Sequence, residues 1–157
     1  MSSTASQSAL GAANCTREQV DPRGPRFGGA VTTVVLAAAL ILIGTTAGTV
    51  LIAWQTVVFA LGAIVGLQAQ PYGIFFRKVI RPRLAAPTEM EDAAPPRFAQ
   101  AVGLAFLVVA LVVSLLGANI VATVAVACAL AAAFLNAVFG FCLGCQMYLL
   151  GKRLAHR

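Results

Sequence analysis

Two cysteines three residues apart, Cys142 and Cys145, are the side chains of this sequence best suited to chemistry. On a helix, residues i and i+3 share one face with Cβ atoms about 5–6 Å apart. Two thiols at that spacing can form a disulfide after a modest adjustment, or can bind one soft metal ion. The pair follows Gly140. If one helix ends there and a short helix begins, free backbone N–H groups would lower the pKa of a cysteine and favour its reactive thiolate.

Three interpretations of the pair remain open: dithiol or sulfur chemistry, handling of a soft metal, and packing, because cysteine is also a small apolar residue. No second pair supports a tetrahedral zinc site, so we predict no metal site and no cofactor. Asn136 is expected on the turn preceding Cys142, where it either bonds to another helix or supports the site. Tyr148 follows Cys145 by three residues and is either an interface anchor or a site residue, and Cys128 is expected to pack.

The elements that position these residues are indicated by composition. The chain has 157 residues, of which 60% are apolar and only 10% charged, whereas soluble domains are about a quarter charged. No charged residue occurs between Arg26 and Arg77 or between Arg97 and Lys152. Helices that are apolar on every side in so small a protein must be buried by lipid. The net charge of +6 lies at the edges of the apolar blocks, so nucleic-acid binding is not expected.

Each apolar block is long enough for two crossings of about 20 residues. In the first block, small and polar residues at 44–49 predict a turn between helices over 28–46 and 50–70. In the second, residues 117–119 separate helices over 98–117 and about 120–141. The surplus residues 71–76 and 142–151 predict an extra segment after each hairpin. The expected fold is an all-α membrane protein with four transmembrane helices arranged as two tandem hairpins.

Positive charges predict the orientation. Both hairpin turns are uncharged, whereas lysines and arginines occupy the N-terminal segment, the connector 71–97 and the C-terminus. The positive-inside rule therefore places both termini and the connector in the cytoplasm, with a multi-pass protein in the inner (plasma) membrane. Residues 1–18 are small and polar and are predicted to be a disordered cytoplasmic tail. Residues 19–154 are expected to form a single membrane domain.

An internal repeat supports two equivalent hairpins. The pattern D-x-x-x-P-R-F-x-x-A-V occurs at 21–31 and again at 92–102, a constant offset of 71. We therefore predict a duplication, with repeats 21–84 and 92–154 in parallel orientation. Arg26 and Arg97 in this motif either snorkel to the membrane interface or also hold an anion or a partner at a cytoplasmic vestibule. The same offset aligns Gly73 with Gly144, yet only the second copy carries the cysteines.

Several motifs resemble a known bacterial membrane family. They are D-P-R-x-P-R-F, P-Y-G-x-x-F-R, R-P-R-L, E-D-A-A-P-P-R-F-A-Q-A-V-G and F-L-N-A-x-F-G-F-C-L-G-C-x-x-Y. Together they resemble the family called domain of unknown function 4395, over residues 20–154. The resemblance implies a membrane location but no established activity. Members of the family resemble proteins whose genes lie beside genes for thioredoxin-like and rhodanese-like proteins. The resemblance therefore implies a cytoplasmic partner that is thioredoxin-like or rhodanese-like.

The favoured hypothesis is a membrane protein linked to thiol redox or sulfur transfer through Cys142 and Cys145. One alternative is a small transporter of a sulfur species or a soft metal ion, for which four helices make a thin pore and a homodimer would be expected. Another is a structural scaffold whose cysteines only pack. No other nucleophile, phosphate loop or metal cluster is apparent in the sequence, so we do not expect a stand-alone enzyme.

Overall fold

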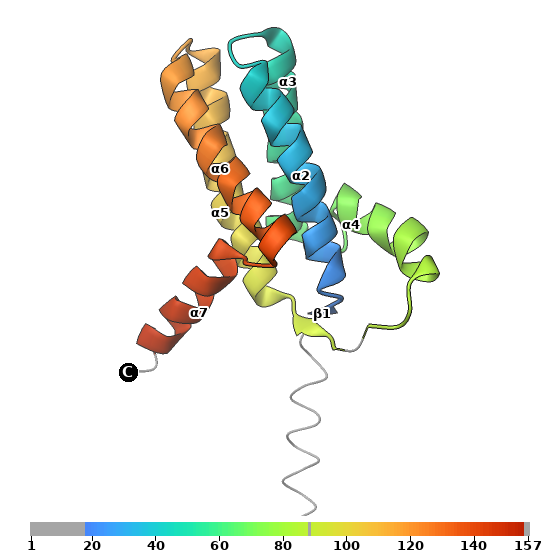
Figure 1. Cartoon of the computed structure of the whole chain (residues 1–157). Coiled ribbons are helices and arrows are strands. Elements are labelled where there is room, and N and C mark those ends of the chain that lie inside the picture. Colours follow the sequence, from blue (N-terminus) through green and yellow to red (C-terminus); the bar gives the residue numbers. More distant parts are fainter. Residues whose placement is uncertain (1–17, 88, 156–157) are drawn as a thin grey trace, which may run out of the picture.

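The computed structural model describes residues 18–87 and 89–155 (Figure 1). Four helical segments are long and apolar enough to cross a membrane. They are α2 (Arg23–Ile41), α3 (Thr46–Ala60) continued by the π-helical η1 (Leu61–Val65), α5 (Ala94–Leu115) and α6 (Asn119–Phe139). The predicted number of membrane-length helices is therefore confirmed.

The four helices form a bundle in which consecutive helices run antiparallel (Figure 1). Helix α2 packs against α3 and α6, and α5 also packs against α3 and α6, so α2 and α5 lie diagonally opposite each other. The core is built from all four helices and is rich in alanine; it comprises Leu36, Ala39, Ile52, Phe59, Leu107, Ala110, Ala125, Val126 and Ala129. Small residues at these positions let the helices approach closely.

The outer surface of the bundle carries many large apolar side chains. Side chains such as Val34, Ile41, Leu116 and Ile120 are between 70% and 83% exposed. A monomeric soluble protein rarely exposes so continuous an apolar surface. Such a surface is compatible with a lipid environment around these helices.

Two uncharged turns lie together at one end, which we call the loop end (Figure 1). The turn between α2 and α3 contains Gly44 with φ +81°, and the turn between α5 and α6 contains Gly117 with φ +79°. Both angles lie in the left-handed region that favours glycine. Thr45 starts α3, because its hydroxyl accepts a hydrogen bond from the N–H of Gly48 at 3.1 Å.

The opposite end, which we call the charged end, holds the segments that flank the hairpins. Strand β1 (Gln19–Val20) pairs antiparallel with β2 (Glu91–Asp92), with Gln19 opposite Asp92. After the first hairpin come α4 (Pro71–Phe75), the π-helical η2 (Phe76–Ile80) and the 3₁₀ turn η3 (Arg81–Arg83). After the second hairpin comes α7 (Leu143–Ala155). These two segments leave the bundle on opposite sides (Figure 1), so an extra segment does follow each hairpin.

The helix boundaries differ from those predicted, mostly in the first hairpin. Helix α2 ends at Ile41 and α3 begins at Thr46, because Thr45, inside the predicted turn 44–49, supplies the N-cap of α3. The first and third membrane-length helices, α2 and α5, also begin earlier than predicted, at Arg23 and Ala94. Prolines in a first helical turn lose no hydrogen bond, so the helices include the repeated motif. The predicted disordered tail 1–18 lies outside the described residues except for Glu18, whose carbonyl accepts a hydrogen bond from Ala93 N–H at 2.8 Å.

Candidate functional site

The break that places the cysteine pair is made by Gly140. Helix α6 ends at Phe139, and Gly140 takes the left-handed conformation, with φ +65°. A left-handed glycine is a common way to end a helix, because the following residue cannot continue it. Helix α7 then begins at Leu143. The helix break at Gly140 and the new helix beginning beside the cysteines, both considered from the sequence, are confirmed.

Cys142 directly precedes the first turn of α7. Its sulfur accepts a hydrogen bond from the backbone N–H of Cys145 at 3.3 Å, and its carbonyl accepts one from Gln146 N–H at 3.0 Å. Cys142 therefore acts as the N-cap of α7. The sulfurs of Cys142 and Cys145 are joined in a disulfide, and their Cα atoms are 5.1 Å apart. Both residues are partly exposed.

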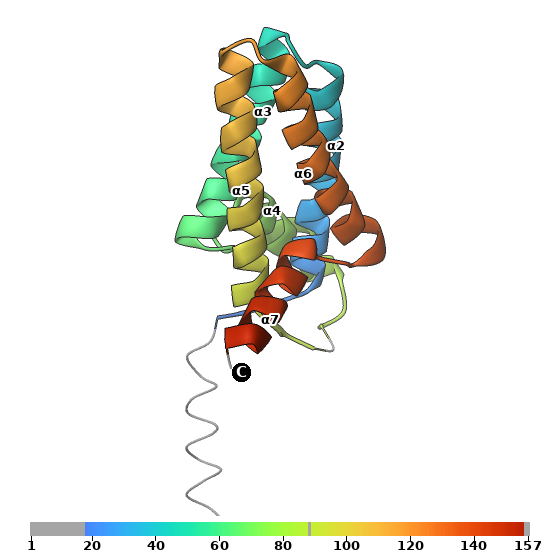
Figure 2. The same ribbon diagram turned by 90° about the vertical axis from the view of Figure 1, so that its left-hand side faces the viewer.

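Helix α7 is held against the start of α5, which fixes the position of the disulfide. A Cβ atom added to Gly144 would lie only 2.5 Å from the Cα of Ala99, so the two backbones are in direct contact. One turn further on, the ring of Tyr148 packs against Phe98 with centroids 5.8 Å apart. Figure 2 shows α7 crossing beneath α5 and α6 at the charged end. Tyr148, singled out as an anchor or a site residue, thus faces α5 and supports the helix that carries the pair.

Asn136 connects α6 to the start of α2. Its side-chain N–H donates to the carbonyl of Pro25 at 3.2 Å. The same nitrogen would lie 3.0 Å from a Cβ on Gly29, so α2 approaches α6 closely there. Interhelical bonding of this kind is a usual role of Asn in a membrane. Asn136 therefore has the structural contact considered for it from the sequence.

The two arginines of the repeated motif behave differently. The guanidinium of Arg97 donates to the carbonyls of Ala63 at 3.2 Å and Ile64 at 2.8 Å, at the end of the span formed by α3 and η1. The guanidinium of Arg26 instead lies over Gly140, within 3.6 Å of the position a Cβ would take there. Among the described residues Arg26 has no hydrogen-bond or ion-pair partner. Of the two arginines, therefore, only Arg26 lies near the cysteine pair.

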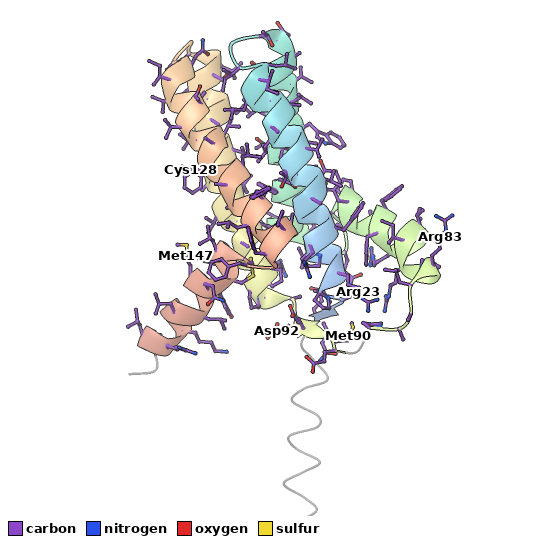
Figure 3. All side chains as sticks on the ribbon, viewed as in Figure 1. Arg23, Arg83, Met90, Asp92, Cys128 and Met147 are labelled. Atoms are coloured by element: carbon purple, nitrogen blue, oxygen red, sulfur yellow. A yellow bond between two sulfur atoms is a disulfide. The ribbon has the colours of Figure 1, made fainter. Side chains whose placement is uncertain are left out.

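A cavity of about 840 Å³ joins the residues around the disulfide. We call it the disulfide cavity; it lies between α2, α5, α6 and α7 and includes both cysteines, Arg26 and Asn136 among its lining residues. Arg97 and Tyr148 are not among them. Cys128 also lines the cavity and is exposed, so our expectation that it packs is wrong. Figure 3 shows Cys128 on α6 and Met147 on α7 on the same side of the molecule.

Sequence reasoning also missed a chain of hydrogen bonds that docks α4 onto the first hairpin. The Trp54 ring N–H donates to the Tyr72 hydroxyl at 3.0 Å, and that hydroxyl donates to the Gln55 side-chain carbonyl at 2.9 Å. The Gln55 amide in turn donates to the Thr32 hydroxyl at 3.1 Å, and Gln55 is fully buried. Burial raises the pKa of the Tyr72 hydroxyl above its ordinary value of 10.0, and the Trp54 hydrogen bond partly opposes that rise. The signal in the sequence that could have indicated these hydrogen bonds is Gln55, a polar residue within an otherwise apolar block.

Metal ligands are not gathered at this site. Within residues 18–87 and 89–155, no group of three or more His, Cys, Asp or Glu side chains is placed to hold a metal ion. The geometry instead offers a pair of sulfurs at a helix N-terminus, one arginine with free donors and an adjoining cavity. This arrangement is suited to thiol exchange with a molecule that enters from the charged end or from the cavity.

The family model described as "Domain of unknown function (DUF4395)" matches residues 20–153. The chain belongs to this family. The DUF4395 match covers both hairpins, α4 and nearly all of α7, including the cysteine pair. No curated protein matches the chain, and no solved structure matches it. Membership in DUF4395 confirms the resemblance found from the motifs.

Proposed function

We propose that this chain is a multi-pass membrane protein whose Cys142–Cys145 pair exchanges electrons or sulfur with a partner protein at the cytoplasmic face. The observation that carries the proposal is the position of Cys142 at the N-terminus of α7, where its sulfur accepts the Cys145 N–H. The partial positive charge of a helix N-terminus stabilises a thiolate there. The pair is partly exposed, so a partner's sulfur can reach it.

The cytoplasmic location rests on charge. All lysines and arginines of the described residues belong to segments at the charged end, and the two turns at the loop end carry none. The positive-inside rule places such an end in the cytoplasm. Reporter fusions at Thr46 and Asn119 are expected to report the outer side. A cytoplasmic signal at either position would contradict the topology.

The exchange can be written with sulfur and electrons balanced. The Cys142 thiolate attacks a disulfide of the partner; a mixed disulfide forms, and the other partner sulfur leaves as a thiolate. The Cys145 thiolate then attacks the Cys142 sulfur and releases the second partner thiolate. The partner is reduced and the pair is oxidised. The reverse sequence passes two electrons from a partner dithiol to the pair.

Sulfur transfer uses the same nucleophile. The Cys142 thiolate would attack the outer sulfur of a persulfide on a rhodanese-like partner, and the partner's cysteine would leave as a thiolate. The persulfide then resides on Cys142, and attack by Cys145 releases the sulfur as hydrosulfide while the Cys142–Cys145 disulfide forms. A thioredoxin-like partner fits the electron exchange, and a rhodanese-like partner fits this variant.

Trapping tests the proposal directly. In cells quenched with acid and an alkylating agent, a Cys145→Ser variant is expected to carry a mixed disulfide on Cys142, because the second thiol that would resolve it is gone. The adduct should be lost on reduction and absent from the Cys142→Ser/Cys145→Ser variant. Cys128→Ser is the matched control and should behave as the wild type. If neither Cys142 nor Cys145 reacts with a thiol probe in intact membranes, the proposal fails.

The tandem duplication is part of the proposal. Asp21 Oδ1 accepts the N–H of Arg23, and Asp92 Oδ1 accepts the N–H of Ala94, both at 3.0 Å and separated by the offset of 71. The packing of α2 with α3 and α6, and of α5 with α6 and α3, fits a twofold axis along the membrane normal. A circular permutant opened between residues 84 and 91, with the natural ends linked, should therefore insert and form the disulfide. A permutant that inserts but leaves both cysteines free would argue against equivalent hairpins.

A small transporter is the second candidate, because the disulfide cavity reaches the middle of α6 at Cys128. Proteoliposomes would be tested for uptake of thiosulfate and of Cu(I), with the wild type and the double serine variant. Equal uptake by both would reject a cysteine-dependent transporter. A scaffold without chemistry predicts instead that the double serine variant has an unchanged phenotype.

A further inference from the structure

The disulfide cavity extends from the charged end into the depth of the bundle. At the charged end it is lined by Pro22 and Glu91, and at its far end by Phe106 and Cys128. Cys128 precedes the end of α6, at Phe139, by eleven residues, which corresponds to ~16 Å at 1.5 Å per residue. The cavity therefore runs from the charged end to about half the depth of a bilayer, whose apolar core is about 30 Å thick.

The cavity wall changes character along this depth. Its inner part is lined by small residues, among them Gly103, Ala129 and Ala132. Its outer part carries the disulfide, Arg26 and Asn136. A volume of about 840 Å³ lies within the range of about 300–1,000 Å³ found for small-molecule sites. The shape suits a molecule with a polar head beside the sulfurs and an apolar remainder in the bundle.

The corresponding space beside the first hairpin is filled by protein. There α4 and η2 fold against α2: Phe76 is buried at 3% exposure beside Gly24, and Tyr72 is bonded to Gln55. The cavity left near α4 measures only about 130 Å³. Helix α7 instead packs against α5 at Gly144, and the space beside the disulfide stays open. The larger cavity is thus a specific property of the half that carries the cysteines.

Arg26 supplies hydrogen-bond donors at the head of this cavity. Its guanidinium has five N–H groups, none of which bonds to another described residue. The guanidinium of Arg97, the counterpart of Arg26 in the repeat, donates instead to backbone carbonyls. A free guanidinium next to a disulfide can donate to carbonyl oxygens of a bound molecule and favours negative charge that develops on them.

We propose that the disulfide cavity binds a quinone, whose ring lies beside Cys142 and Cys145 and whose apolar tail extends toward Cys128. This inference rests on the proposed thiol function and names its electron acceptor inside the membrane. A quinone is a planar apolar ring with two carbonyl oxygens, so it matches a largely apolar cavity whose polar end offers hydrogen-bond donors, above all the free guanidinium of Arg26. It is lipid-soluble and can enter from the bilayer.

The reaction balances without a further reagent. A partner dithiol first reduces the Cys142–Cys145 disulfide and becomes a disulfide itself. The cysteine dithiol then gives two electrons and two protons to the quinone: the two S–H bonds break, the S–S bond re-forms, and two O–H bonds form on the ring oxygens to give a hydroquinone. Electrons thus pass from partner thiols through the cysteine pair to the membrane quinone pool.

The test uses the full chain in phosphatidylcholine vesicles. The protein is reduced with dithiothreitol, freed of reductant, and mixed with decylubiquinone, whose reduction is followed by absorbance. We expect one quinone reduced per reduced protein and none with the Cys142→Ser/Cys145→Ser variant. Binding of a radiolabelled short-tail quinone is measured separately on the oxidised wild type and on the double serine variant, and both should bind it.

Variants of the cavity decide whether it is the site. Ala132→Phe, and the milder Ala132→Leu, should abolish or weaken both binding and reduction, because each fills the cavity. Ala105→Phe adds the same bulk on the exposed side of α5, outside the cavity lining, and should leave both unchanged. Arg26→Gln should weaken binding about tenfold or more through loss of a charge-assisted donor. Formation of the Cys142–Cys145 disulfide in each variant verifies its fold.

Three results would overturn the inference. Equal quinone binding and reduction by Ala132→Phe and Ala105→Phe would exclude the cavity as the site. A co-purified phospholipid that quinone does not displace would make the cavity a structural lipid site. If the cysteines trap a partner but the protein neither binds nor reduces quinone, the inference is refuted and the proposed function stands. If the cysteines are inert to every thiol probe, both are refuted.

Discussion

Replacement of Gly144 by alanine is expected to detach α7 from α5. A Cβ at this position would lie 2.5 Å from the Cα and 2.6 Å from the Cβ of Ala99. Ordinary carbon–carbon contacts are about 3.5–4.0 Å, so α7 would have to move outward by about 1 Å. The obstruction is the backbone and Cβ of another helix, which cannot rotate away as a long side chain could.

The cost can be separated from helix propensity by a matched control. Gly151 lies on the same helix, and a Cβ added there meets nothing within 4 Å. Both substitutions gain about 0.5–1 kcal/mol from replacing a helical glycine by alanine. Overpacking costs about 1–3 kcal/mol and applies to Gly144 alone. The difference between the variants is therefore the cost of the clash, about 1–3 kcal/mol in the docking of α7.

Amide hydrogen exchange in detergent micelles measures this docking locally. Relative to Gly151→Ala, the Gly144→Ala variant should exchange the central amides of α7 about 5- to 150-fold faster, the equivalent of 1–3 kcal/mol. Exchange in the core of α6 should be the same in both. Equal protection of α7 in the two variants would show that α7 is not held by the Gly144–Ala99 contact, and would refute the reasoning.

Two further predictions concern the first hairpin and the repeated arginines. Tyr72→Phe leaves the buried Gln55 carbonyl oxygen without its donor, which should cost about 1–3 kcal/mol of folding free energy and lower the midpoint of thermal unfolding. Trp54→Phe removes only the donor to the Tyr72 oxygen and should cost less. Equal effects of the two variants would contradict this order of hydrogen bonds. The pKa of Tyr72 is raised in the folded state, so its neutral form contributes stability that is complete below about pH 10 and is lost as the pH rises through the raised pKa. In alkaline unfolding the wild type should show that loss of stability, and Tyr72→Phe should not. Arg97→Gln breaks two bonds to backbone carbonyls and should destabilise the protein by about 1.5–3 kcal/mol, while Arg26→Gln should leave stability unchanged; a larger loss for Arg26→Gln would overturn the distinction drawn between the two.

Much of the fold follows from the sequence because its causes are local. Charge-free blocks of membrane length predict four spans, and Gly140 between the last span and Cys142 predicts a helix end followed by a new helix. Helix starts were harder to predict, because prolines that look like boundaries are tolerated inside a first turn, as in α2 and α5.

The candidate site depends on packing between segments that are distant in the sequence, so much of it could not be predicted from the sequence. Arg26 and Arg97 occupy identical positions in the repeated motif, yet only Arg97 meets free carbonyls. The disulfide cavity arises where alanines of α6 face glycine and alanine of α5, and a pattern of small residues predicts close packing as readily as a space. The middle of a span likewise favours packing for Cys128, whereas its side chain lines that cavity.

The redox equilibrium of Cys142 and Cys145 in native membranes tests the central claim most directly. Membranes would be equilibrated with thiol buffers of defined potential, quenched, and assayed for each cysteine by differential alkylation, with Cys128→Ser as the background. A reversible pair should interconvert with a midpoint between about −270 and −120 mV, the range of thiol oxidoreductases, and the reduced Cys142 should alkylate with a pKa below the usual value of about 8.5. A pair that stays oxidised below about −300 mV would be a structural disulfide and would contradict the proposed function.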